Sequence, residues 1–138
     1  TTVFRSLARG DEMKRKNNRG QAMLELALVL PVLLLLLFGI FEFGRLFHDY
    51  MVVTSAAREG ARAGAVGASN TVIVNHVKTA ASGIGDTSHL TVNINKSIAD
   101  GQISVTVNHS VSLVTPLISS FFATNPVPVQ GTAVMRLE

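Results

Sequence analysis

Acid–base and metal chemistry need ionisable side chains at close spacing, and this sequence offers few of them. None of the four histidines has a partner at metal-ligand spacing, such as a second histidine four residues along a helix; they are His48, His76, His89 and His109. His48 and Asp49 are adjacent, and adjacent residues on a helix do not share a face. Ser104 and Ser112 alternate with apolar residues as outward strand positions do, and the glycines form no phosphate-cradling loop. We therefore expect no catalytic site, no cofactor and no metal site.

The charge distribution argues against nucleic-acid binding. Residues 1–20 carry six basic and two acidic groups, a net charge of +4, whereas residues 21–138 carry six basic and seven acidic groups, a net charge of −1. A short basic tail beside an apolar segment is typical of membrane orientation and not of phosphate-backbone recognition. The chain also has no cysteine, which excludes disulfides and thiolate metal sites.

The apolar segment from Leu26 to Phe41 carries no charge, and thirteen of its sixteen residues are Leu, Ile, Val or Phe. Extended back to Ala22, a helix of this length covers about 30 Å, the thickness of a hydrocarbon core. Its apolar side chains favour insertion by about 5 kcal/mol, more than Glu25 costs near one end. No small-x-small site follows closely enough for a cleaved secretory signal. We predict a retained transmembrane helix, kinked at Pro31, in the inner (cytoplasmic) membrane, with the N-terminus cytoplasmic and the C-terminal portion exported.

The helix is predicted to continue beyond the membrane. Apolar residues recur every three or four positions after Glu42, which indicates one helix from about Gln21 to Val66 that stops near Gly64 and Gly67. The recurring positions are Phe43, Leu46, Phe47, Tyr50, Val53, Ala57, Ala61 and Ala65. Small residues at this spacing let another backbone approach closely; they are Ala57, Gly60, Ala61, Gly64 and Ala65. This surface packs on the chain's own globular domain or on neighbouring subunits, and the two interpretations are compatible.

The second half of the chain changes to a strand pattern. A second helix, capped at Ser69 and Asn70, carries Ile73, Val77, Ala80 and Ile84 and ends at Gly83 or Gly85. Leu90, Val92 and Ile94, and then Ile103, Val105 and Val107, alternate with polar residues around an Asp100–Gly101 turn. Residues 111–114 and 129–137 are weaker strand candidates, separated by a proline-containing loop or short helix around Phe121 and Phe122.

These patterns predict an α+β fold with a long N-terminal helix, a second short helix and a small antiparallel sheet. The N-terminal helix would have a transmembrane half and an amphipathic extension. We divide the chain into a basic leader at 1–20, a transmembrane segment at 21–42, the helix extension at 43–67 and an exported α+β domain at 68–138.

The N-terminal half resembles the TadE-like family, the pseudopilins of tight-adherence (Flp-type) pilus systems. The resemblance rests on RGQAMLELALVLP at 19–31, the leucine run that follows, and FGIFEFGR at 38–45. The sequence AAREGARAG at 56–64 resembles the alanine- and arginine-rich helix end of the same family. The remaining half agrees only in outline with this pilin-like family.

The resemblance implies that a prepilin peptidase cuts the basic leader between Gly20 and Gln21, which makes Glu25 the fifth mature residue. The carboxylate of Glu25 can then pair with the new α-amine of a neighbouring subunit. Such a pair is strongest in low dielectric and sets the axial register between subunits. The alternative is that Glu25 reaches the lipid headgroups from near the helix end.

The resulting hypothesis is a minor pilin-like subunit, a pseudopilin of a tight-adherence type IV pilus, that assembles through its N-terminal helix and supports pilus biogenesis and adhesion. Its partners would be membrane lipid, other pilin-like subunits, the prepilin peptidase and the pilus assembly machinery. The alternatives are the main structural subunit of a surface filament and a single-pass anchor that presents a small binding domain. Major pilins of this system, as the family is usually described, are much shorter and almost entirely helical, which favours the minor subunit.

Overall fold

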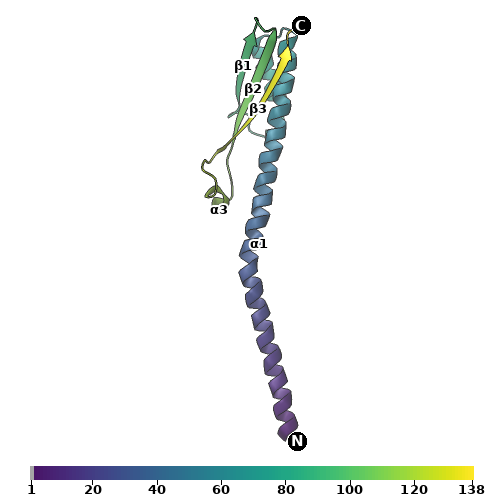
Figure 1. The fold of residues 1–138 in the computed structure, drawn as a ribbon, viewed down its shortest axis with the longest axis vertical. Helices are drawn as coiled ribbons and strands as arrows, with labels where there is room; N and C mark the ends of the chain where they lie inside the picture. Colours follow the sequence, from purple (N-terminus) through teal and green to yellow (C-terminus); the bar gives the residue numbers. More distant parts are fainter. Residues whose placement is uncertain (1) are drawn as a thin grey trace. The chain divides into compact units, whose positions relative to one another are not determined.

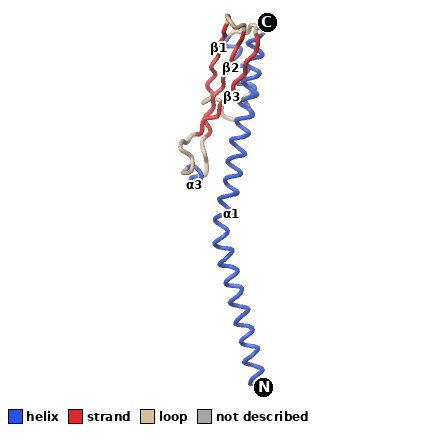
Figure 2. The backbone as a smooth tube through the Cα atoms, viewed as in Figure 1, coloured by secondary structure: helices blue, strands red, loops and turns tan. Residues whose placement is uncertain are grey.

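The computed structural model describes the backbone of residues 2–138 and the side chains of residues 2, 5 and 18–138. Its elements in chain order are α1 (Thr2–Ala65), α2 (Asn70–Ala80), the 3-10 turn η1 (Ser82–Ile84), β1 (Thr91–Ser97), β2 (Gln102–Val111), α3 (Pro116–Ser119) and β3 (Val127–Arg136). Figure 1 and Figure 2 show the three strands beside the C-terminal part of α1. The α+β fold with one long helix, a short second helix and an antiparallel sheet is confirmed.

The chain forms two compact units, Thr1–Gly39 and Ile40–Glu138, and α1 contributes to both. The predicted helix extension at 43–67 and the predicted exported domain at 68–138 therefore lie in the same unit. Residues 2–39 of the first unit are helical, whereas the second unit contains the rest of α1, the sheet and the short helices.

Helix α1 begins at Thr2, so the prediction that it starts near Gln21 is wrong. The predicted leader has no proline, and ten of its twenty residues are Arg, Lys, Ala, Leu, Met or Glu, which all favour helix. A change from basic to apolar composition does not by itself interrupt backbone hydrogen bonding. Most of the leader's charged side chains belong to residues 6–17, whose side chains lie outside the described part of the chain.

The C-terminal end of α1 follows the glycine signal in the sequence. Gly67 has φ +86°, a conformation that glycine adopts without a steric penalty. Its N–H donates to the carbonyl of Gly64 at 3.1 Å, and the N–H of Ala68 donates to the carbonyl of Ala63 at 3.2 Å. This pair of hydrogen bonds satisfies the last helical carbonyls and turns the chain toward α2.

The second helix is shorter than the apolar spacing suggests. It ends at Ala80, and Ile84 is the last residue of η1, which is followed by Gly85 with φ +86°. Ile73 and Val77 are the buried residues of α2, as their four-residue spacing predicts for one helical face.

The sheet has the strand order β1-β2-β3, and both pairs are antiparallel. The β1–β2 turn ends at Gly101, where φ is +61°. The predicted strand at 111–114 is wrong, because β2 ends at Val111 and the N–H of Val114 donates to a side chain of α1. The last strand candidate is β3, which runs to Arg136.

The core lies between one face of the sheet, α2 and the part of α1 from Val53 to Ala65. Alternate β2 side chains point into it, as a period of two requires. The core cluster consists of Val53, Ala56, Ala57, Ala61, Ala65, Ile73, Val77, Ala81, Leu90, Ile103, Val105, Val107 and Ala133. β3 meets α1 without an intervening side chain at Gly131, where a Cβ atom would lie 2.7 Å from Cα of Thr54.

Candidate membrane and assembly site

The apolar part of α1 has no protein cover. Of the described residues, one helix is long and apolar enough to cross a membrane, and its most apolar 18-residue window has a mean hydropathy of 2.7 with none of it buried. Large apolar side chains from Met23 to Phe41 are exposed along it. Pro31 lies inside this part of α1 and has no N–H to donate, so one helical hydrogen bond is missing there. The kink at Pro31 stays a prediction.

The predicted processing site lies on the same helix. Gly20, Gln21 and Glu25 are all exposed, and α1 runs through them without a break. The side-chain amide of Gln21 donates to Oε1 of Glu25 at 3.4 Å. This contact places residues 21 and 25 on one face, as expected for positions four apart. A peptidase would have to open this helical turn to reach the bond between Gly20 and Gln21.

The small residues of α1 pack within the chain. Ala57 and Ala61 are fully buried and Ala65 is nearly so. A Cβ atom at Gly60 would lie 2.5 Å from Cγ2 of Val77 and 3.1 Å from Cγ1 of Val105. Gly64 lies in the same way against side chains of α2 and β2, those of Ile73 and Ile103. This surface serves the chain's own core, which is the first of the two interpretations of the small-residue pattern.

The apolar stripe of the helix extension is only partly covered by the sheet. Phe43, Phe47 and Tyr50 are 69%, 55% and 50% exposed, whereas Val53 on the same stripe is fully buried. The exposed aromatic residues therefore form an uncovered apolar surface within the unit Ile40–Glu138.

Glu42 is a functional candidate that the sequence analysis did not identify. Its side chain is 2% exposed. Oε1 accepts hydrogen bonds from the N–H of Val114 at 2.8 Å, the N–H of Thr115 at 2.9 Å and the hydroxyl of Thr115 at 3.0 Å. Oε2 accepts a hydrogen bond from Arg45 at 3.1 Å. A buried carboxylate needs such donors to offset the loss of water, and here the donors fix the chain after β2 to the residue of α1 that directly precedes the helix extension.

The chain between β2 and β3 forms a loop closed at its base. The N–H of Leu113 donates to the side-chain oxygen of Asn125 at 3.2 Å. The loop contains α3, which begins at Pro116 directly after the two N–H groups that bind Glu42. We call residues 112–126 the connecting loop.

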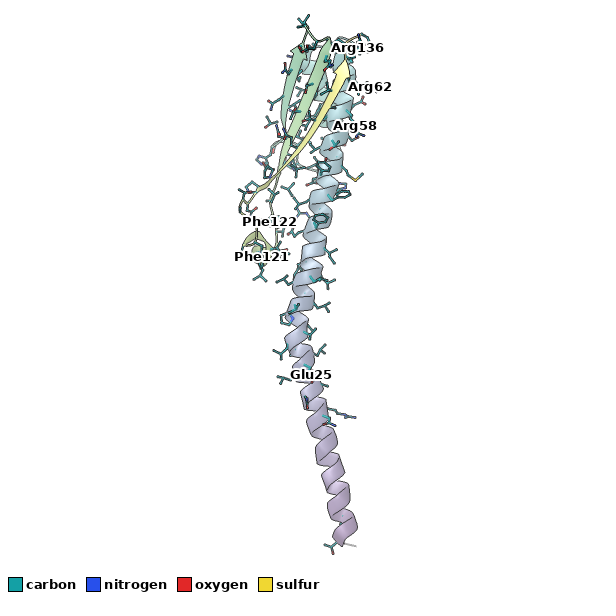
Figure 3. The ribbon with its side chains drawn as sticks, in the orientation of Figure 1. Glu25, Arg58, Arg62, Phe121, Phe122 and Arg136 are labelled. Carbon is teal, nitrogen blue, oxygen red and sulfur yellow. The ribbon has the colours of Figure 1, made fainter. Side chains whose placement is uncertain are left out.

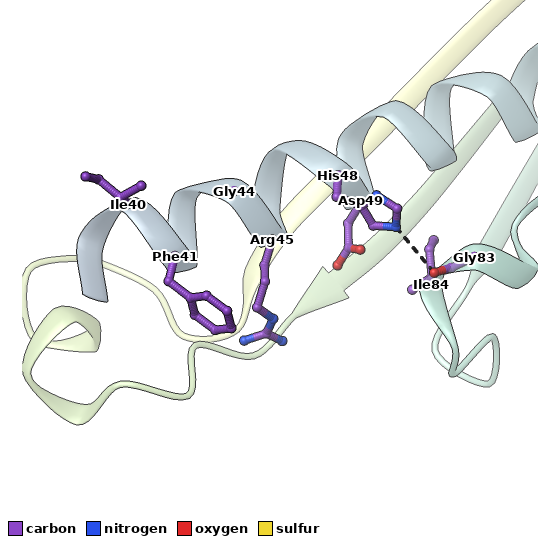
Figure 4. Close-up of a pocket in the computed structure, with 8 residues that line it drawn as sticks. All are labelled: Ile40, Phe41, Gly44, Arg45, His48, Asp49, Gly83 and Ile84. Atoms are coloured by element: carbon purple, nitrogen blue, oxygen red, sulfur yellow. Dashed lines mark hydrogen bonds between the residues drawn. The ribbon is translucent and has the colours of Figure 1, made fainter. Parts of the chain in front are cut away.

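A groove runs along α1 beside η1 (Figure 4). His48 lies against it, with Nε2 at 3.4 Å from the carbonyl oxygen of Gly83. Nearby, Oδ2 of Asp49 is 4.0 Å from Nε2 of the buried His109. The other histidines pair elsewhere, His76 with Glu59 and His89 with Asp86. Within the described part of the chain, no group of three His, Cys, Asp or Glu side chains is placed to hold a metal ion.

The remaining charged pair of the helix extension is exposed. Arg62 donates to Oε1 of Glu59 at 2.9 Å. This hydrogen bond lowers the pKa of Glu59 against a partial loss of hydration, and the positive charge of Arg62 acts in the same direction. Exposed pairs of this kind contribute little to stability because water screens them.

Comparison with known proteins bears on this helix. Residues 20–62 match the TadE-like protein family. The predicted resemblance is confirmed over this segment, which we call the TadE-like segment. It includes Glu25, Pro31 and Glu42 and ends within the small-residue surface. No curated protein and no solved structure matches the chain. The match points to a pilin-like protein associated with tight-adherence pilus systems, and the single apolar helix is consistent with a single-pass membrane protein.

Proposed function

We propose that the chain is a minor pilin-like subunit of a tight-adherence type IV pilus system, anchored and assembled through its TadE-like segment. One observation carries the proposal: the family match falls on a helix whose apolar half has no protein cover. A helix that is apolar on all sides requires lipid or other apolar helices around it. A pilin-like protein meets both environments, lipid before assembly and the apolar helices of neighbouring subunits after it.

Before assembly, residues 21–42 span the inner membrane. About 20 residues of helix match the hydrocarbon thickness. The basic residues before Gly20 keep the N-terminus in the cytoplasm, so residues 68–138 fold on the exported side. The unit Ile40–Glu138 supports this separation of roles, since its core cluster consists of residues from Val53 onward.

Assembly is proposed to begin with cleavage between Gly20 and Gln21 by a prepilin peptidase. The new α-amine of Gln21 and the carboxylate of Glu25 would carry opposite charges on one apolar helix. A carboxylate in an apolar environment is strongly unfavourable unless it is paired. Pairing with the amine of an adjacent subunit satisfies both charges and selects one axial offset between the two helices.

The packing of α1 determines which surface remains for other subunits. Ala57, Gly60 and Ala61 are occupied by the chain's own sheet and α2. The contacts between subunits would therefore use the uncovered residues before Val53, where leucine and phenylalanine side chains are exposed. The chain would then support pilus biogenesis and adhesion by packing its α1 helix against the helices of other subunits. We assign no catalytic step to the chain.

The variant Glu25→Ala tests this function. We expect Glu25→Ala to reach the membrane fraction in normal amounts, because removal of a charge favours insertion. It should be lost from surface material released by shearing and should no longer copurify with other pilin-like subunits. Glu59→Ala is the matched control, since Glu59 is a carboxylate on the same helix outside the apolar segment. Normal recovery of Glu25→Ala from the surface fraction would remove the role proposed for this carboxylate.

A further inference from the structure

Contacts within the unit Ile40–Glu138 determine which part of α1 the connecting loop lies beside. β2 runs antiparallel to the helix extension. Successive residues of β2 therefore contact α1 at positions that are progressively closer to the N-terminal end of the extension. Ile103 lies against Gly64 and Val105 against Gly60. Farther along, His109 lies 4.0 Å from Asp49, and the N–H of Thr115 bonds Glu42. The connecting loop is therefore attached to α1 at Glu42, the first residue after the uncharged segment that ends at Phe41.

The connecting loop presents apolar side chains that nothing in the described chain covers. Val114, Leu117 and Phe121 are 69%, 60% and 77% exposed, and Phe122 is 44% exposed. Figure 3 shows Phe121 and Phe122 at the opposite end of the sheet from Arg136. The sequence from Ser110 to Met135 contains no charged residue. A loop of this composition can enter a lipid surface without taking a charge out of water.

We propose that the connecting loop is a second membrane contact, which inserts Leu117, Phe121 and Phe122 into the lipid interface beside the point where α1 leaves the bilayer. The inference rests on the membrane anchorage proposed above. Lipid is favoured over a second copy of the chain because the loop is tied to α1 at the level of Ile40 and Phe41, which are themselves 63% exposed. Phenylalanine and leucine side chains are common on the apolar face of segments that lie in the membrane interface.

Glu42 gains a role from this arrangement. Its carboxylate holds the N–H groups of Val114 and Thr115, so the loop is presented to the membrane in one orientation. The globular part would then be held by two points, the helix and the loop, and its rotation about the helix axis would be restricted. Release of the loop from lipid would accompany extraction of the subunit into a filament.

Single-tryptophan variants of the full chain test the inference, because the chain contains no tryptophan. Phe121→Trp is the reporter, and Leu117→Trp is a second reporter at another exposed position. Leu36→Trp reports on the membrane segment. Ile98→Trp is the negative control, since Ile98 is 88% exposed in the β1–β2 turn. A ten-residue β2 places that turn about 30 Å from the connecting loop. Each variant is reconstituted into phosphatidylcholine vesicles with and without bromine on the acyl chains.

The expected result is strong quenching of Phe121→Trp and Leu117→Trp by lipids brominated at shallow acyl positions, with a blue-shifted emission. Leu36→Trp should be quenched by deeper bromines, and Ile98→Trp should not be quenched. Quenching of Leu36→Trp without quenching of either loop reporter would overturn the inference and leave the anchorage intact. Absence of quenching at Leu36→Trp would contradict the anchorage itself. A blue shift in both loop reporters without lipid quenching would mean that protein covers the loop, which also overturns the inference.

Discussion

Replacement of Glu42 by alanine should destabilise the globular unit and release the connecting loop. The carboxylate receives three hydrogen bonds on Oε1 and one from Arg45 on Oε2. The variant Glu42→Ala removes all four acceptor contacts at once. It also leaves the N–H groups of Val114 and Thr115 without their partner at the base of the loop.

The magnitude follows from the number and kind of these contacts. A hydrogen bond to a charged group contributes about 1.5–3 kcal/mol, and contributions within one cluster are not additive. Val114 is 69% exposed, so its N–H can recover part of the loss from water. We therefore expect a decrease of about 3 kcal/mol in the free energy of unfolding, which corresponds to a Tm about 12 °C lower or more for a unit of this size. Glu42→Gln keeps an acceptor for the loop and should lose about half as much, because it no longer pairs with Arg45.

The assay is thermal unfolding of the full chain in detergent micelles, followed through the infrared signal of the sheet, with hydrogen exchange across residues 113–122. Glu59→Ala is the matched control, because Glu59 also has an arginine three residues later, but its side chain is 34% exposed whereas that of Glu42 is 2% exposed. We expect little change in that control. A Tm for Glu42→Ala equal to that of the control, with unchanged exchange in the loop, would refute the assignment of Glu42 as the group that holds the loop.

Two glycine substitutions test the packing of α1. Gly131→Ala should lower the free energy of unfolding by about 3 kcal/mol, because its Cβ would lie 2.7 Å from Cα of Thr54 and only backbone movement can relieve the overlap. Gly44→Ala is the control, since nothing lies within 4 Å of its Cβ position and helix propensity should raise stability by up to about 1 kcal/mol. Gly60→Ala should cost about 1–2 kcal/mol, less than Gly131→Ala, because it meets side chains that can shift, such as that of Val77. Chemical denaturation of all three variants checks the order, and equal stability of Gly131→Ala and Gly44→Ala would show that β3 does not contact the helix backbone.

Local sequence patterns were sufficient to predict most of the helices, strands and turns of the fold. The two-residue alternation around Val105 predicts β2, because a half-buried strand exposes and buries successive residues. Gly67 and Gly101 mark the end of α1 and a turn, since both adopt positive φ. The small residues of α1 indicate close packing, although the sequence alone does not decide between an internal and an external partner.

Contacts between distant positions were the part that the sequence analysis missed. Glu42 follows the apolar segment and has the pattern of an ordinary charged residue at a membrane boundary. Its partners Val114 and Thr115 lie 72 and 73 positions away, and their N–H groups carry no sequence signature. The same contact explains why residues 112–114 do not extend β2 despite their apolar composition. The start of α1 at Thr2 was missed for a different reason, because the apolar periodicity that predicts the helix begins only after the leader.

The central claim is that the chain is processed at Gly20 and assembled through the exposed part of α1. Its most direct test is the intact mass and N-terminal sequence of the protein recovered separately from membranes and from sheared surface material. The account predicts a chain that begins at Gln21 in the sheared fraction. A chain that retains residues 1–20 and occurs only in membranes would contradict it, and would point to a single-pass anchor in which Glu25 is an ordinary carboxylate near the helix end.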